Sequence, residues 1–281
     1  MNLYQQAIDL IKTGTSFRHF YRNMNVTLKR LNGNYTMLHF PMEEKPEQSF
    51  IQGQINLTNF CLASLGDVRG LRLLEIGCGN GVQAKYICQN YDPAFVTGID
   101  LNPDNINIAQ SQQKIRNIHN MLFLVDDAQE LNQIDSGSMD AVICIESAFH
   151  YPDKEKFLKQ LWRVLKPGGR FLVADLLTTV RSKGTGIRRL WKGKMELNHW
   201  NVDLYQDHFK KCFFHLKESF DITERVIGGF RGYQKWISEI ERTGIIRDFF
   251  FKIFYTITIE WLLFLLRYRR RYMVFVGIKS I

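Results

Sequence analysis

Three glycines that directly follow an apolar segment are the residues of this sequence best suited to binding a ligand. Residues 71–76 predict a buried strand, and Gly77, Gly79 and Gly81 follow it at every second position. Glycine permits a tight turn, so that backbone N–H groups and a helix N-terminus can approach a ligand closely. A dinucleotide fingerprint would need glycine in place of Val82, and a P-loop would end in Gly-Lys-Ser/Thr. The spacing therefore indicates a nucleotide-type ligand and disfavours both phosphate-binding motifs.

A carboxylate at the end of the next predicted strand could bind the sugar of such a ligand. Asp100 ends the segment Val-Thr-Gly-Ile-Asp, one strand-helix-strand unit after the glycines. A carboxylate at this point can accept hydrogen bonds from both hydroxyls of a ribose. The structural alternative is that Asp100 only forms the turn before Leu-Asn-Pro.

Five ordered segments between residues 70 and 177 resemble the class I S-adenosylmethionine-dependent methyltransferases. They correspond to the first motif, the second motif, the adenine-side motif and the regions of the fourth and fifth strands, at residues 75–81, 98–102, 126–131, 139–153 and 161–176. The resemblance implies S-adenosyl-L-methionine as the cofactor. It also implies an α/β, Rossmann-like fold, with a seven-stranded sheet that carries helices on both faces.

The same resemblance assigns the residues that would contact the cofactor. The glycines would surround its amino-acid half, Asp100 its ribose, Leu101 its adenine and Asp127 the exocyclic amine of the adenine. The full set of expected contacts is Tyr21, Gly77, Cys78, Gly79, Gly81, Asp100, Leu101, Asp127, Ala128 and Ile145. Asp127 has an alternative role as the N-cap of a helix that begins at Ala-Gln-Glu-Leu.

His150 is the candidate general base, although a single histidine is more often a packing or surface residue. Its loop resembles that of bacterial natural-product methyltransferases, including sugar O-methyltransferases, in which a histidine pair precedes Pro-Asp and a histidine acts as base. Phe149 replaces the first histidine of that pair. Asp175 matches a carboxylate near the acceptor hydroxyl in those enzymes, and its alternative role is a cap or turn. We expect His150 to take the acceptor proton and Asp175 to orient the reacting groups.

Residues 1–69 predict an N-terminal helical lid, with helical patterns at 3–11 and 55–66. Residues 30–41 resemble a segment of the same subgroup that closes over the cofactor. The candidate lid residues are Tyr21, Asn34 and His39, and packing into the core is the alternative for the aromatic side chains of this segment.

Residues 70–281 predict the methyltransferase domain itself. Short apolar strands alternate with helical segments, which is typical of a parallel sheet covered on both faces. We expect a cap insertion at 178–218, a sixth strand at 220–227, an apolar helical insertion at 229–271 and a seventh strand at 272–278. The resemblance implies that the last two strands pair antiparallel at one sheet edge.

Residues 248–272 form a long aromatic and apolar segment that Lys252 and Glu260 interrupt. These charges disfavour a membrane-spanning helix. A helix packed on the domain or on a partner, including a homodimer partner, is one expectation. The other is peripheral membrane contact, in which an interfacial helix enters lipid while anionic headgroups meet Arg267, Arg269, Arg270 and Arg271.

The composition and charge of the chain indicate its cellular compartment and the classes of its binding partners. The 281 residues carry a formal net charge of +9, which permits an acidic partner, but RNA-binding signatures are absent from the sequence and a nucleic-acid substrate is disfavoured. The N-terminal segment lacks the features of a signal peptide. Reduced thiols in the cytoplasm are indicated by an odd number of cysteines without a C-x-x-C pair, namely Cys61, Cys78, Cys88, Cys144 and Cys212. We expect no metal site.

The function expected from these features is methyl transfer to a small, hydrophobic acceptor, at a hydroxyl oxygen. Three alternatives stay open: a C- or N-methyltransferase, a cyclase-like enzyme that binds the cofactor without net methyl transfer, and an RNA methyltransferase. The fold itself does not select among acceptors.

Overall fold

The structure, a computed structural model, describes residues 17–46, 48–116, 118–179, 198–239 and 245–280. The helix expected at 3–11 and most of the expected cap insertion lie outside these residues.

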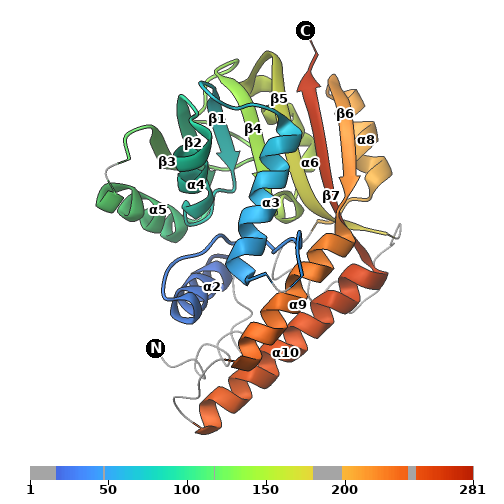
Figure 1. The fold of residues 1–281 in the computed structure, drawn as a ribbon. Coiled ribbons are helices and arrows are strands. Elements are labelled where there is room, and N and C mark those ends of the chain that lie inside the picture. The colour runs from blue at the N-terminus through green and yellow to red at the C-terminus, as the bar shows by residue number, and fades with distance from the viewer. Residues whose placement is uncertain (1–16, 47, 117, 180–197, 240–244, 281) are drawn as a thin grey trace.

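A seven-stranded sheet in the order β3-β2-β1-β4-β5-β7-β6 forms the centre of the molecule (Figure 1). The strands are β1 Arg72–Ile76, β2 Phe95–Asp100, β3 Met121–Val125, β4 Met139–Ile145, β5 Leu165–Thr178, β6 Phe214–Asp221 and β7 Arg270–Lys279. Strands β1 to β5 are parallel, and β7 is antiparallel to both β5 and β6. The order reverses between β1 and β4, the position at which such sheets bind ligands.

Helices cover both faces of the sheet, and each face has its own apolar core. Alternate residues of one strand enter different cores: Leu73 packs into the first and Leu74 into the second. The helices are α2 Phe17–Asn32, α3 Phe50–Leu65, α4 Val82–Tyr91, α5 Pro103–Arg116, α6 Lys154–Val164, α8 Val202–Lys211, α9 Thr223–Glu239 and α10 Ile245–Tyr268, with the short 3-10 helix η1 Ala148–His150. The predicted Rossmann-like fold is therefore confirmed.

The sixth strand lies earlier in the chain than the sequence pattern predicts. It spans Phe214–Asp221, and the segment expected to form it begins helix α9 at Thr223. Most side chains of β6 are exposed because it is an edge strand, so it lacks an apolar alternation. By contrast, Ile222, Val226 and Phe230 are buried at intervals of four residues, which is a helical period. The expected cap therefore ends before Phe214.

Two other boundaries differ from the expectation. The apolar helix α10 ends at Tyr268, and Arg270 already begins β7. Residues 166–169 lie within β5, where the pairing with β4 shifts from Met139–Leu165 to Ala141–Arg170 as at a bulge. Within the part of the chain that the structure describes, no helix is long and apolar enough to cross a membrane.

Candidate active site

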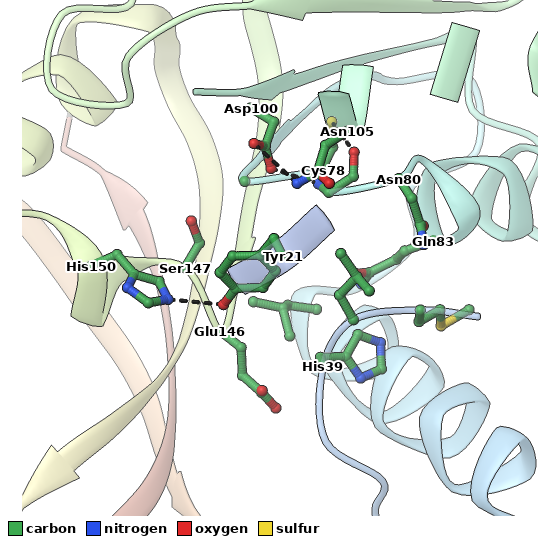
Figure 2. Close-up of a pocket in the computed structure, with 15 residues that line it drawn as sticks. Tyr21, His39, Cys78, Asn80, Gln83, Asp100, Asn105, Glu146, Ser147 and His150 are labelled. Atoms are coloured by element: carbon green, nitrogen blue, oxygen red, sulfur yellow. Dashed lines mark hydrogen bonds between the residues drawn. The ribbon is translucent and has the colours of Figure 1, made fainter. Parts of the chain in front are cut away.

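A pocket lies beyond the carboxyl ends of β1 and β4, where the strand order reverses (Figure 2). Helix α2 and residues 37–39 cover it from the N-terminal segment. Its lining residues are Tyr21, Met37, Leu38, His39, Gly77, Cys78, Gly79, Asn80, Gln83, Asp100, Asn105, Ile145, Glu146, Ser147 and His150. Within the described residues, no group of His, Cys, Asp and Glu side chains could hold a metal ion.

The loop after β1 has a backbone that only glycine adopts without strain. Gly77, Gly79 and Gly81 have φ angles of 74°, 54° and 76°, in the left-handed region. A Cβ atom on Gly77 would lie 2.4 Å from the Cβ of Ser147. The loop thus leaves a backbone-lined cradle next to β4, and Gly81 forms the N-cap of α4.

Asp100 lies at the end of β2 and its carboxylate is held by the glycine loop. Oδ2 accepts a hydrogen bond from the Gly79 N–H at 2.9 Å, and Oδ1 accepts one from the Asn102 N–H at 2.8 Å. Asn105 Nδ2 donates to Oδ1 at 3.3 Å. Burial outweighs these hydrogen bonds and raises the pKa of Asp100 to about 6. The predicted ribose carboxylate therefore lines the pocket in a fixed position.

The charge state of Asp100 gives a prediction about ligand binding. If its carboxylate accepts ribose hydroxyls, then affinity for S-adenosylmethionine should fall as the pH drops below about 6, by up to about tenfold per pH unit. Asp100→Asn should bind more weakly, with little pH dependence across the same range. Calorimetric titration over a pH series that brackets this value measures both effects. A wild-type affinity that does not change with pH would remove Asp100 from the ligand contacts.

His150 and Tyr21 meet inside the pocket from distant parts of the chain. Tyr21 comes from α2 and His150 from η1, just after β4. The Tyr21 Oη and the His150 Nε2 lie 2.9 Å apart, and the two rings meet edge to face. Burial raises the pKa of Tyr21 far above its usual range, so its hydroxyl stays protonated. In the tautomer that accepts this proton, His150 Nε2 is a base that points into the pocket.

Glu146 is a pocket residue that the sequence analysis missed. Its Oε1 accepts hydrogen bonds from the Phe40 N–H at 2.6 Å and from the Tyr272 hydroxyl at 2.9 Å. Its φ angle is 52°, which is unusual for a non-glycine residue. The signal in the sequence is a carboxylate that directly follows the fourth apolar strand. Glu146 ties the N-terminal segment to β4 and β7.

Burial raises the pKa of Glu146 from 4.5 to about 8. The folded protein therefore holds a proton that the unfolded chain releases at lower pH, and it loses stability as the pH rises between these two values. A neutral amide has no such dependence. Glu146→Gln should become more stable than the wild type as the pH rises toward about 8, by at most about 1.4 kcal/mol per pH unit.

Thermal denaturation of both proteins over this pH range measures the difference. Glu218→Gln, at an exposed position of β6, is the matched control and should show no such trend. A stability difference for Glu146→Gln that is the same at every pH would contradict the assignment of the buried proton.

The structure does not bring Asp175 to the pocket. Its side chain is fully buried on the face that α6 and α8 cover, where Lys154 Nζ donates to it at 2.7 Å and the Tyr205 hydroxyl at 2.5 Å. The ion pair neutralises this buried carboxylate. Asp175 lies outside the pocket lining, and its role in orienting the acceptor stays a prediction.

The three adenine-side residues also lie outside the pocket lining. The Leu101 side chain is 58% exposed, and Ala128 is buried in the second core. Asp127 accepts a hydrogen bond from the Gln129 N–H at 2.8 Å, but residues 128–130 form a turn and not the helix that its alternative role as an N-cap requires. Asp126 donates its N–H to the Asp100 carbonyl at 3.3 Å, so this segment lies beside Asp100. Their contact with adenine stays a prediction.

The lid residues divide between the pocket and the surface. His39 lines the pocket next to Leu38, and burial lowers its pKa to about 4, so it is neutral. Its ring bonds the Thr58 hydroxyl and the Phe40 carbonyl. Asn34 is exposed and lies outside the lining. The pocket residues Asn80, Gln83 and Asn105, which the sequence analysis did not name, come from the glycine loop and the first turns of α4 and α5.

Comparisons with known proteins agree with this geometry. Residues 74–173 match the family described as "Methyltransferase domain". The fatty-acid O-methyltransferase of Mycolicibacterium smegmatis is 43% identical over 113 residues, which are 40% of this chain and 40% of that protein. The chain spans less than half of the length of the curated relatives that it matches.

Two solved structures share the fold over nearly the whole chain. The [4+2]-cyclase SpnF has a TM-score of 0.75 at 19% identity, with 95% of this chain and 97% of that chain covered. Geranyl diphosphate C-methyltransferase from Streptomyces coelicolor A3(2), in complex with Mg2+, geranyl-S-thiolodiphosphate and S-adenosyl-L-homocysteine, has a TM-score of 0.71 at 17% identity, with 94% and 96% covered. Residues 74–173 therefore match a methyltransferase domain in sequence, and nearly the whole chain shares its fold with a cyclase and a C-methyltransferase.

Proposed function

We propose that the protein transfers a methyl group from S-adenosyl-L-methionine to an oxygen of a small, lipid-like acceptor. The observation that carries this proposal is the convergence, in one pocket, of the glycine cradle, the Asp100 carboxylate and the His150–Tyr21 pair. The cradle fits the amino-acid half of the cofactor, because side chains at its positive-φ positions would fill the space. Asp100 offers the ribose two carboxylate oxygens.

The cofactor, when bound, supplies an electrophilic methyl group on a sulfonium sulfur. The contribution of the protein is to align the acceptor oxygen with that methyl and to exclude water. His150 Nε2 removes the proton from an acceptor hydroxyl while the oxygen–carbon bond forms and the carbon–sulfur bond breaks. The acceptor hydroxyl takes the place of the Tyr21 hydroxyl at Nε2, and Tyr21 then orients the bound oxygen.

A lipid-like acceptor is supported by the similarity to a fatty-acid O-methyltransferase and by apolar pocket residues such as Met37, Leu38 and Ile145. Such an acceptor could be methylated at a carboxylate oxygen or at a hydroxyl oxygen, and these two oxygens differ chemically. A carboxylate is already ionised at neutral pH and needs no base, whereas a hydroxyl must lose a proton. The His150–Tyr21 pair is the observation that favours the hydroxyl.

The test is incubation of the protein with methyl-labelled S-adenosylmethionine and either a fatty alcohol or a fatty acid. We expect labelled ether from the alcohol, together with S-adenosylhomocysteine in equal amount. If only the ester were labelled, a lipid-like acceptor would stand, but His150 would have no role in proton transfer. Bound cofactor without any labelled lipid would contradict the proposal.

The likeness to SpnF favours one second candidate, a cyclase-like enzyme that keeps the cofactor intact. The two functions differ in whether S-adenosylhomocysteine accumulates in step with the product. Methylation at carbon or nitrogen would release S-adenosylhomocysteine as well, and is distinguished by the position of the label in the product.

We place the proposed reaction in the cytoplasm.

A further inference from the structure

Helix α10 has two apolar faces, and only one of them packs against the rest of the protein. Ile259, Leu263 and Leu266 are buried in the first core, beside α9 and β7. A helix on the surface of a soluble domain carries polar residues on its other face. The exposed side of α10 instead carries five large apolar or aromatic residues, Ile253, Ile257, Trp261, Phe264 and Tyr268.

These five residues, which we call the outer stripe, lie along one line of the helix. At about 100° of rotation per residue they fall within an arc of about 80°, roughly opposite to the buried face. Trp261 and Tyr268 are 61% and 60% exposed. The ring of Phe264 packs against the rings of both, with centroids 5.6 and 5.1 Å apart. The outer stripe is thus a continuous exposed surface of aromatic rings.

The charges around the outer stripe are asymmetric. Exposed Arg267 and Arg269 stand at the carboxyl end of the helix, and neither forms an ion pair with residues that the structure describes. Between residues 253 and 268, Glu260 is the one carboxylate. The whole chain carries a formal charge of +9. An anionic surface attracts these two arginines, whereas the same helix end of a second copy of the chain would repel them.

We infer that the outer stripe of α10 docks the protein on an anionic lipid bilayer, with the aromatic side chains in the interface and Arg267 and Arg269 at the headgroups. Tryptophan and tyrosine favour this depth of a membrane, and an apolar face flanked by basic residues is typical of interfacial helices. The inference deepens the proposed function and rests on its lipid-like acceptor. It also leaves Arg271 out of the arginines expected to meet the headgroups, because Arg271 forms an ion pair with Asp221 at 3.3 Å.

Helix α10 is connected to the covered end of the pocket through α9. In Figure 1, α9 and α10 run side by side on the same side of the sheet as α2, beyond the end of β1. Phe230 of α9 packs edge to face on Phe40, with ring centroids 5.0 Å apart, and the Phe40 N–H binds Glu146 in the pocket wall. A protein docked through α10 would therefore present this end of the sheet to lipid.

Cosedimentation of the full chain with lipid vesicles tests the inference. We expect binding to vesicles of phosphatidylcholine mixed with phosphatidylglycerol, and weak binding to phosphatidylcholine alone. The double variant W261S/F264S should lower the partition coefficient at least about tenfold, and R267Q and R269Q about fivefold each. F213S is the matched control, because Phe213 is 73% exposed and lies outside the outer stripe.

Three results would overturn the inference: no binding of the wild type to anionic vesicles, equal binding by W261S/F264S, or a dimer in sedimentation velocity that this variant dissociates. The last result would assign the outer stripe to a second copy of the chain. Transfer to a short, water-soluble alcohol, measured without vesicles, separates the two proposals. W261S/F264S should retain this methyl transfer. If the wild type binds vesicles but does not methylate the short alcohol, only the proposed function is rejected.

Discussion

Replacement of His150 by alanine should lower the rate of methyl transfer to a hydroxyl acceptor by about 10² to 10⁴-fold. His150 is buried in the pocket, and its Nε2 lies 2.9 Å from the Tyr21 hydroxyl. A carboxylate acceptor needs no proton removal at neutral pH, so its methylation should fall far less. The measurement is the steady-state rate of product formation with each acceptor at saturating cofactor.

Two controls separate proton transfer from structural damage. Tyr21→Phe keeps the ring and removes one hydrogen bond, so we expect a smaller loss of up to about tenfold. His215→Ala, at an exposed position of β6, should leave the rate unchanged. Cofactor affinity of His150→Ala, measured by calorimetry, should stay close to that of the wild type. Equal losses for hydroxyl and carboxylate acceptors would show that His150 only shapes the pocket.

Gly77→Ala should weaken cofactor binding at least about 100-fold. A Cβ at this position would lie 2.1 Å from the Ser147 Oγ and 2.4 Å from the Ser147 Cβ, at a φ angle of 74°. The contact includes the Cβ of Ser147, and rotation of the Ser147 hydroxyl cannot relieve it. The loop must therefore move, and the Gly79 N–H that holds the Asp100 carboxylate moves with it.

Gly137→Ala is the control for this variant. Gly137 has a similar φ angle of 61°, but a Cβ there would meet nothing within 4 Å. It should cost only the backbone strain, about 1–2 kcal/mol of stability, with cofactor affinity unchanged. Calorimetric titration measures the affinities and thermal denaturation the stabilities. If Gly77→Ala bound the cofactor as well as Gly137→Ala does, the cradle would not be the binding site.

The sequence predicted the parallel part of the sheet well, because these strands are buried on both faces and read as short apolar runs. The edge strand β6 was misplaced because its side chains are exposed. The same burial on both faces explains why the sequence could not place the Asp175 side chain relative to the pocket. Its neighbours Ala174 and Leu176 are buried as well, so the pattern does not reveal which face the carboxylate enters.

The glycine loop and Asp100 were predictable because their chemistry is local to a strand end. The Tyr21–His150 contact joins residues 129 positions apart, and the bonds that Phe40 and Tyr272 donate to Glu146 span 106 and 126 positions. Such contacts depend on how the N-terminal segment crosses the sheet, which local periodicity does not encode.

The most direct test of the account uses a hydroxy fatty acid, which offers a hydroxyl and a carboxylate in one molecule. The wild type and His150→Ala are incubated with methyl-labelled S-adenosylmethionine, and mass spectrometry locates the label in the product. The account predicts the methyl ether from the wild type and its loss in His150→Ala. The methyl ester as the only product, or bound cofactor without any methylated oxygen, would contradict it.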